Sequence, residues 1–66
     1  MKIKYDREVD ILYVSLSDEV VYESDEDKKG VILDYTVDGR IAGIEILNAS
    51  AHAMNPAKVE YEFAHA

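Results

Sequence analysis

Two carboxyl groups in the middle of the sequence are spaced for shared chemistry. Asp34 and Glu45 fall on two β-favouring stretches that a turn at Asp38-Gly39 would pair. In that pairing the two carboxyl groups lie diagonally on one face, within reach of each other. Acid–base catalysis uses carboxyl groups whose pKa values are driven apart by their environments. A flat sheet face lacks the concavity of a catalytic cleft, so we expect a polar outer face or an interface hydrogen bond here.

Three acidic residues near the N-terminus alternate along a polar connection. Asp6, Glu8 and Asp10 could bring oxygen atoms to a hard cation such as calcium. No glycine turns this connection, and no later acidic residue completes a calcium loop. The pattern favours a solvated turn capped by Asp6 or Asp10, and the sequence predicts no metal site.

His52 is the residue best placed to act as a general base. None of the serines lies in the strand–turn–helix context of a nucleophile elbow, and the three glycines are too far apart for a phosphate-binding loop. We therefore expect no catalytic residue, no cofactor and no enzymatic activity. A minor metal-dependent or acid–base enzyme that uses Asp34, Glu45 or His52 is the alternative.

Length and composition limit the class of protein. The chain has 66 residues, enough for one domain over 1–66, and its hydrophobic fraction of 48% is too high for a disordered chain. A domain of this size buries only about 60% of the surface that its unfolded chain exposes. No cysteine is present, so disulfides and thiolate zinc sites are excluded. Self-association, most simply as a homodimer, is one remaining source of stability, and a very well packed monomer is the other.

The charge of the chain restricts its partners. The net charge is −7, from 14 acidic and 7 basic residues. Nucleic-acid binding requires Lys and Arg to neutralise phosphates, so we expect no nucleic-acid partner. The acidic run 23–27 is interpreted as a solvated loop, with docking to a small basic protein as the alternative. No apolar run has the length of a signal segment or a membrane span, so a cytoplasmic location and no membrane contact are predicted.

Alternating and β-branched residues predict strands in the first third of the chain. Residues 2–5 alternate between charged and apolar side chains. Residues 11–16 are rich in β-branched and aromatic side chains, which suit a pleated surface. A turn at 17–19 then leads to a third strand that begins at 20–22, so the second and third strands are expected to form a hairpin.

The Asp38-Gly39 pair is the strongest local signal in the sequence. It separates the β-rich stretches 31–37 and 40–47 and favours a type I′ turn with a two-residue loop. The resulting sheet has one apolar face and one mixed face, as a half-buried antiparallel sheet should have. Three opposed pairs are predicted on the apolar face: Leu33 with Ile44, Val31 with Ile46, and Tyr35 with Ala42.

One short helix is predicted after the sheet. Asn48 is the expected N-cap of a helix over 49–54, which Pro56 limits. At about two turns this helix cannot stand alone, so we expect it to pack on one face of the sheet. The expected contacts of the helix are Ala49, Ala53 and Met54.

The C-terminal residues 58–63 alternate strictly between charged and apolar side chains. This pattern favours a terminal strand, which can pair within its own chain or with a neighbouring one. A helix with Pro56 at its first position is the alternative. Together the elements predict an α+β fold: an antiparallel β-meander of four to five strands, a short helix packed on one face, and a C-terminal strand.

The functional hypothesis is a non-catalytic interaction module that associates through its sheet. The contact is expected on the mixed face or along the C-terminal strand. An acidic, antitoxin-like protein that masks a small basic partner is the alternative. The candidate interface residues are Tyr13, Tyr22, Ile32, Ile41, Leu47, Val59, Tyr61 and Phe63.

Several blocks of the sequence resemble a known family. Tyr5-Asp6, residues 10–14 and 30–35, Asp38-Gly39-Arg40 and residues 43–50 are similar, in order and spacing, to the small prokaryotic domain of unknown function 2283 family. The likeness covers residues 1–50 and leaves 51–66 as a variable segment. Val9 and Asn48 depart from the alanine and aspartate that are usual or frequent in the family. The resemblance implies a β-meander with a helix, no established activity, and small neighbouring proteins, some toxin-like, as partners.

Overall fold

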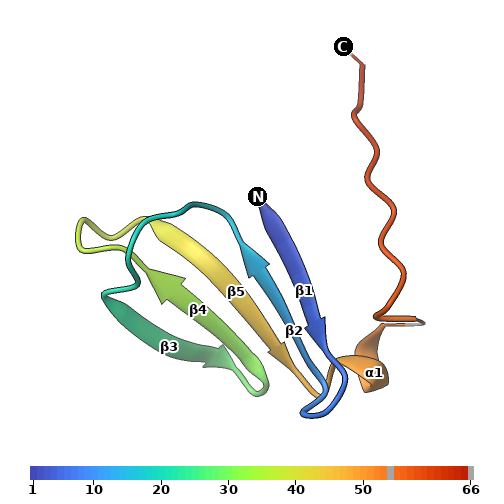
Figure 1. Cartoon of the computed structure of the whole chain (residues 1–66). Helices are drawn as coiled ribbons and strands as arrows, with labels where there is room; N and C mark the ends of the chain where they lie inside the picture. Colours follow the sequence, from blue (N-terminus) through green and yellow to red (C-terminus); the bar gives the residue numbers. More distant parts are fainter. Residues whose placement is uncertain (54, 66) are drawn as a thin grey trace.

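The computed structural model describes residues 1–53 and 55–65. Its centre is a five-stranded antiparallel sheet, followed by one short helix (Figure 1). This confirms the predicted antiparallel sheet with a single helix. The elements are β1 (Lys2–Asp6), β2 (Ile11–Ser15), β3 (Glu23–Lys28), β4 (Val31–Tyr35), β5 (Ile41–Leu47) and α1 (Ala49–His52).

The strand order is β1-β2-β5-β4-β3, so the sheet is not a simple meander. The connection 16–22 crosses from β2 to the far edge of the sheet, where β3 begins (Figure 1). β3, β4 and β5 then follow one another, and β5 returns to pair with β2. This is a Greek-key connection.

The predicted hairpin between residues 11–16 and 20–22 is wrong. β2 pairs with β1 and β5, and the third strand lies in the charged run Glu23–Lys28 instead. That run forms an edge strand whose residues are all exposed. Charged side chains suit an edge because they stay in water and discourage unwanted pairing, which is why an apolar pattern does not reveal this strand.

The Asp38-Gly39 turn forms, but not as a type I′ turn. Gly39 has a φ of 85°, whereas Asp38 is not among the residues with positive φ. The Gly39 N–H donates to the Thr36 carbonyl at 3.0 Å, and the Thr36 N–H donates to the Arg40 carbonyl at 2.8 Å. The loop is therefore the longer kind, in which glycine follows a type I turn.

A β-bulge restores the register that this longer loop displaces. Tyr35 lies opposite Ile41 and Asp34 opposite Gly43, so Ala42 is the extra residue. The predicted pair of Tyr35 with Ala42 is therefore wrong, and Ile41 moves to the apolar face. Beyond the bulge, Val31 opposes Ile46 and Leu33 opposes Ile44, and both of these predicted pairs are confirmed.

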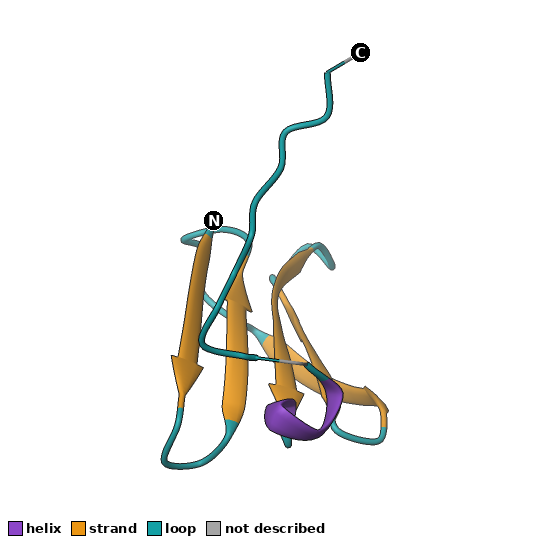
Figure 2. Cartoon of the chain, turned by 90° about the vertical axis from the view of Figure 1, so that its right-hand side faces the viewer, coloured by secondary structure: helices purple, strands orange, loops and turns teal. Residues whose placement is uncertain are grey.

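The helix α1 sits at the end of the sheet beside the β1–β2 turn (Figures 1 and 2). The Ala49 N–H donates to the Asp10 carbonyl at 3.0 Å, and Ala49 is buried. The packing of the helix on a face of the sheet is not confirmed. The predicted contact Met54 lies outside the described residues. Within the described part of the chain, no helix is long and apolar enough to span a membrane.

Asn48 does not cap the helix through its side chain, so that prediction is wrong. Its φ is 56°, in the left-handed region, and its side chain makes no capping hydrogen bond. Asp10 takes the role instead, because its Oδ1 accepts the Ser50 N–H at 3.0 Å. The cap comes from a residue far away in the sequence, which local spacing cannot indicate.

The described C-terminal residues 55–65 contain neither a strand nor a helix, so the predicted C-terminal strand is absent. The segment runs away from the sheet (Figures 1 and 2). Val59, Tyr61 and Phe63 are 55%, 74% and 80% exposed. A strand is stabilised by pairing with a neighbour, and this segment lies apart from the sheet along most of its length.

Candidate functional site

One face of the sheet carries apolar and aromatic side chains across β1, β2, β5 and β4. Opposed residues of antiparallel strands point to the same side, so their pairing defines rows across the sheet. Two rows cross these strands unbroken, and Tyr35 and Ile41 extend them toward the Asp38-Gly39 turn. We refer to these residues as the apolar face: Ile3, Tyr5, Leu12, Val14, Val31, Leu33, Tyr35, Ile41, Ile44 and Ile46.

The side chains of the apolar face are only partly buried and do not form a closed hydrophobic core. They are half-buried, apart from Ile3 and Ile41, which are 41% and 43% exposed. The only buried apolar side chains in the described residues are Ala42 and Ala49. A sheet face of this kind normally packs against a second layer, and the five described strands all belong to one sheet. The apolar face is therefore the first candidate for a contact surface.

Charged residues of β3 border the apolar face. Lys28 lies opposite Val31, and Asp25 lies opposite Leu33, so each apolar row ends in a charge at this edge. Both charged residues are exposed. The border limits the apolar surface to β1, β2, β5 and β4.

The opposite side of the sheet, here the reverse face, holds the predicted carboxyl pair. Asp34 is only 8% exposed, and the Ser24 Oγ donates to its Oδ1 at 2.6 Å. Burial, a hydrogen bond with Asp34 and the Asp34 charge raise the pKa of the Glu45 carboxyl. The predicted proximity of these two carboxyl groups is confirmed. The Ser24 hydrogen bond joins β3 to β4, and the proximity of Glu45 to Asp34 extends this polar cluster to β5.

Gly43 makes room for this carboxyl pair. It lies opposite both Asp34 and Ser15 on the reverse face. A Cβ at Gly43 would lie 2.9 Å from the Val14 carbonyl oxygen and 3.4 Å from Asp34 Oδ2. The Asp34 side chain thus lies against the space that a larger residue would fill. Gly43 therefore allows close packing of neighbouring groups. The sequence did not indicate this role, because Gly43 lies outside the turns.

Asp10 joins the β1–β2 turn to α1. Its Oδ1 accepts the Tyr5 hydroxyl at 2.7 Å, and its Oδ2 accepts the Ser50 hydroxyl at 2.6 Å. The hydrogen bonds from Ser50 and Tyr5 lower the pKa of Asp10, and the same bond to Asp10 raises the pKa of the Tyr5 phenol. Asp10 adopts a φ of 57°, a conformation that aspartate tolerates better than most residues. The group is a structural cap.

The predicted turn role of Asp6 is confirmed as well. Its Oδ1 accepts the backbone N–H groups of Glu8 at 3.0 Å and Val9 at 3.4 Å. Asp6 and Asp10 therefore direct their carboxylates to different donors. Across residues 1–53 and 55–65, no three His, Asp or Glu side chains are grouped as metal ligands.

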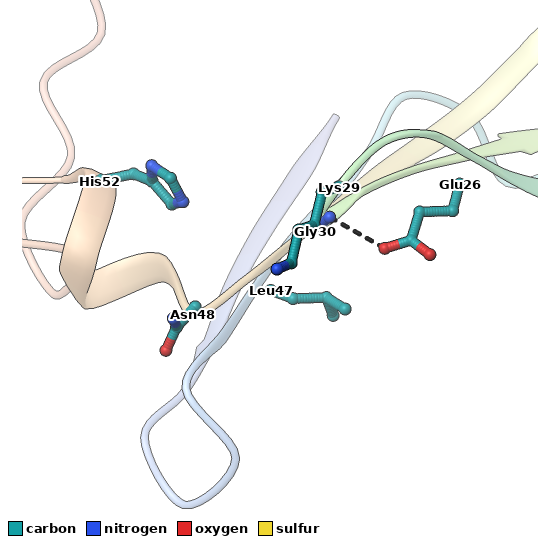
Figure 3. A pocket seen from close by; sticks show the side chains of 6 residues that line it. All are labelled: Glu26, Lys29, Gly30, Leu47, Asn48 and His52. Carbon is teal, nitrogen blue, oxygen red and sulfur yellow. Dashed lines mark hydrogen bonds between the residues drawn. The ribbon is translucent and has the colours of Figure 1, made fainter.

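His52 lines a shallow cavity of about 450 Å³ at the end of the sheet (Figure 3). Glu26 closes one side, where its Oε2 accepts the Gly30 N–H at 2.9 Å. The residues around this cavity do not include Asp34 or Glu45, so His52 and the carboxyl pair do not form one site. The lining residues are Glu26, Lys29, Gly30, Leu47, Asn48 and His52.

The predicted interface residues fall on separate surfaces. Tyr13, Ile32 and Leu47 are half-buried on the reverse face. Tyr22 is 69% exposed in the connection 16–22, and Ile41 lies on the apolar face. Val59, Tyr61 and Phe63 belong to the C-terminal segment. The sequence analysis predicted an apolar face but did not predict that this face stays uncovered. The length of the predicted helix could have indicated it, because a helix of two turns is too short to cover two rows of side chains.

The structure defines a class: a small single-sheet α+β domain with a Greek-key connection, in which an aspartate caps the terminal helix. The family model described as Protein of unknown function (DUF2283) matches residues 2–50. The chain belongs to this family, as the sequence resemblance predicted. The match spans all the strands and the start of α1, and the C-terminal segment lies outside it. Comparisons with curated proteins and with solved structures give no match.

Proposed function

We propose that this chain is a non-catalytic interaction module that forms a homodimer through its apolar face. The observation that carries the proposal is the pair of unbroken apolar rows whose side chains are only half-buried. Two copies that face each other would pack as a sandwich, with sheets about 10 Å apart. The proposed contact therefore uses the apolar face, whereas the sequence had favoured the mixed reverse face or the C-terminal strand.

The energetics support this arrangement. Complete burial of a large apolar side chain is worth about 1.5–3 kcal/mol, so covering a half-buried one adds about 1 kcal/mol. Association costs about 4–15 kcal/mol in lost freedom. The apolar faces of two copies together offset that cost. The chain contains no cysteine, so no disulfide provides the stability instead.

Salt dependence distinguishes this dimer from a charge-driven complex. Each copy carries a net charge of −7, and the charges lie outside the apolar face. Two copies repel each other through these charges, and salt screens the repulsion. Added sodium chloride should therefore strengthen the dimer.

Sedimentation velocity over a dilution series in low and high salt tests the proposal. The expected result is a species of twice 7.4 kDa that dissociates on dilution and persists to lower concentration in high salt. A species of 7.4 kDa at every concentration and salt level would refute the homodimer. A dimer that salt dissociates would show that attraction between charges, and not the apolar face, provides most of the binding energy.

The acidic edge strand supports a second candidate, an antitoxin-like protein that binds a small basic partner. β3 presents Glu23, Asp25, Glu26 and Asp27 along an edge whose residues are all exposed. A basic partner strand could pair with this edge and neutralise it. A basic protein retained at low salt by the native chain, but not by an Asp25→Asn/Asp27→Asn variant, would support this candidate. Equal retention by both chains would exclude it.

A further inference from the structure

We propose that residues 58–63 of a second copy bind the free edge of β1 as an added strand. The inference rests on the proposed self-association and names the segment that crosses between copies. β1 is an edge strand, because within residues 1–53 and 55–65 it pairs only with β2. Its outer backbone groups are therefore available to a new strand, which is a common mode of peptide recognition.

The C-terminal segment has the pattern of a strand that lacks a partner. Its apolar side chains Val59, Tyr61 and Phe63 alternate with Lys58, Glu60 and Glu62. In the described part of the segment, the one backbone hydrogen bond joins the Lys58 N–H to the Asn55 carbonyl at 3.0 Å, so the alternating residues after it are free to pair. Unpaired strand-like chain with exposed aromatic rings favours association.

Charge distinguishes the two edges of the sheet. The β3 edge carries a run of acidic side chains and repels a segment that contains Glu60 and Glu62. The β1 edge carries Lys2 and Lys4, both on the reverse face. Opposite charges on neighbouring strands stabilise their pairing, and like charges oppose it. The acidic segment therefore fits β1.

The side-chain alternation of residues 58–63 matches that of β1 on both faces of the sheet. When Glu60 and Glu62 lie beside the lysines of β1, the apolar residues of the segment must point to the other side. There they extend the apolar face next to Ile3 and Tyr5. The match depends only on the two-residue period, so it holds for either strand direction. Val59 lines a cavity of about 330 Å³ together with Ile3 and Tyr5, so the start of the segment is compatible with this surface.

The direction of the segment indicates a second copy as the partner. The exposed fraction rises from 55% at Val59 to 80% at Phe63, because the segment leaves its own sheet. Figures 1 and 2 show it departing on the side of β1. Two copies that exchange this segment satisfy both β1 edges symmetrically, as a closed dimer requires.

Disulfide trapping tests the exchange directly, since the chain contains no cysteine of its own. A Lys4→Cys chain is mixed with a Glu60→Cys chain under mild oxidation, and products are separated by mass. The expected major product is the mixed disulfide of the two chains. The matched control pairs Lys4→Cys with Asp27→Cys on the β3 edge, and it should give little mixed product.

Two outcomes would overturn the exchange. One is a mixed yield no higher than that of the control. The other is a Lys4→Cys/Glu60→Cys double variant that closes within one chain at the monomer mass while the mixed chains stay unlinked, because the segment then pairs with its own β1.

A truncated chain separates this inference from the proposed dimer. A chain that ends at Ala57 lacks the segment but keeps the apolar face, and it should dimerise about tenfold more weakly than the full chain. Unchanged dimerisation of the truncated chain would overturn the exchange and leave the apolar-face dimer intact. A monomeric full chain would remove both proposals. Reversal to Lys2→Glu/Lys4→Glu should weaken the dimer, and adding Glu60→Lys/Glu62→Lys should restore it.

Discussion

Truncation of Ile44 tests, through the change in dimer Kd, which face of the sheet forms the contact. Ile44 is half-buried on the apolar face, and its row neighbours Val14 and Leu33 flank it on β2 and β4. Ile44→Ala removes three carbon atoms, worth about 2.4 kcal/mol at about 0.8 kcal/mol for each buried carbon. If about half of that burial comes from the second copy, both copies together lose about 2.4 kcal/mol, or about 50-fold in dimer Kd.

Ile32→Ala provides the matched control for this measurement. Ile32 is also a half-buried isoleucine on an inner strand, but it lies on the reverse face opposite Glu45. Sedimentation equilibrium of the two variants should show about a 50-fold weaker dimer for Ile44→Ala and no more than about a twofold change for Ile32→Ala. Equal effects of the two truncations, or a larger effect of Ile32→Ala, would refute the assignment of the contact to the apolar face.

Three further predictions concern the internal contacts of the sheet. The raised pKa of Glu45 means that its contribution to stability is present below its ordinary value of 4.5 and is lost as pH rises through the folded-state pKa. Glu45→Gln should flatten that loss and raise the free energy of unfolding at pH 7; urea denaturation at several pH values that shows no difference would contradict this. The lowered pKa of Asp10 has the opposite sign, so its contribution is present above the unfolded-state pKa and lost as pH falls through the folded value. Asp10→Asn should remove this acid-side dependence, and an unchanged pH profile in thermal denaturation would count against the capping role. Gly43→Ala should cost about 1–3 kcal/mol, because its new Cβ meets the Val14 carbonyl oxygen and a backbone atom cannot easily move away; urea denaturation with an unchanged midpoint would show that the strand does adjust.

The features that the sequence predicted correctly depend on local side-chain pattern. Leu33 and Ile44, like Val31 and Ile46, oppose each other as the turn signal at Asp38-Gly39 implied. The turn type was wrong, yet the register survived, because the Ala42 bulge compensates for the longer loop. The longer loop shifts the pairing by one residue and the bulge shifts it back, so the predicted register holds beyond the bulge.

The features that were missed depend on contacts between distant segments. β2 and β5 are far apart in the sequence, so local periodicity could not indicate that they pair. The β3 strand lacks an apolar pattern because all of its residues face water. The cap of α1 comes from Asp10, which is 40 residues away from Ser50. Charge patterns and tertiary hydrogen bonds decide these features, and apolar alternation does not report on them.

The candidate site shows the same division. The proximity of Asp34 and Glu45 followed from strand parity, which a hairpin fixes. Strand parity does not indicate whether the apolar face is covered, because that depends on how far the short helix extends. α1 reaches only the end of the sheet, so most side chains of the apolar face remain half-buried.

Isotope-filtered NMR on a mixture of labelled and unlabelled chains is the most direct measurement of the central claim. Selective labelling of isoleucine methyl groups reports on both faces, since Ile44 and Ile46 lie on the apolar face and Ile32 on the reverse face. The proposed dimer predicts intermolecular methyl contacts from Ile44 and Ile46 to the leucine and valine methyls of the apolar face. Intermolecular contacts from Ile32 alone, or none at a concentration where sedimentation shows a dimer, would contradict it.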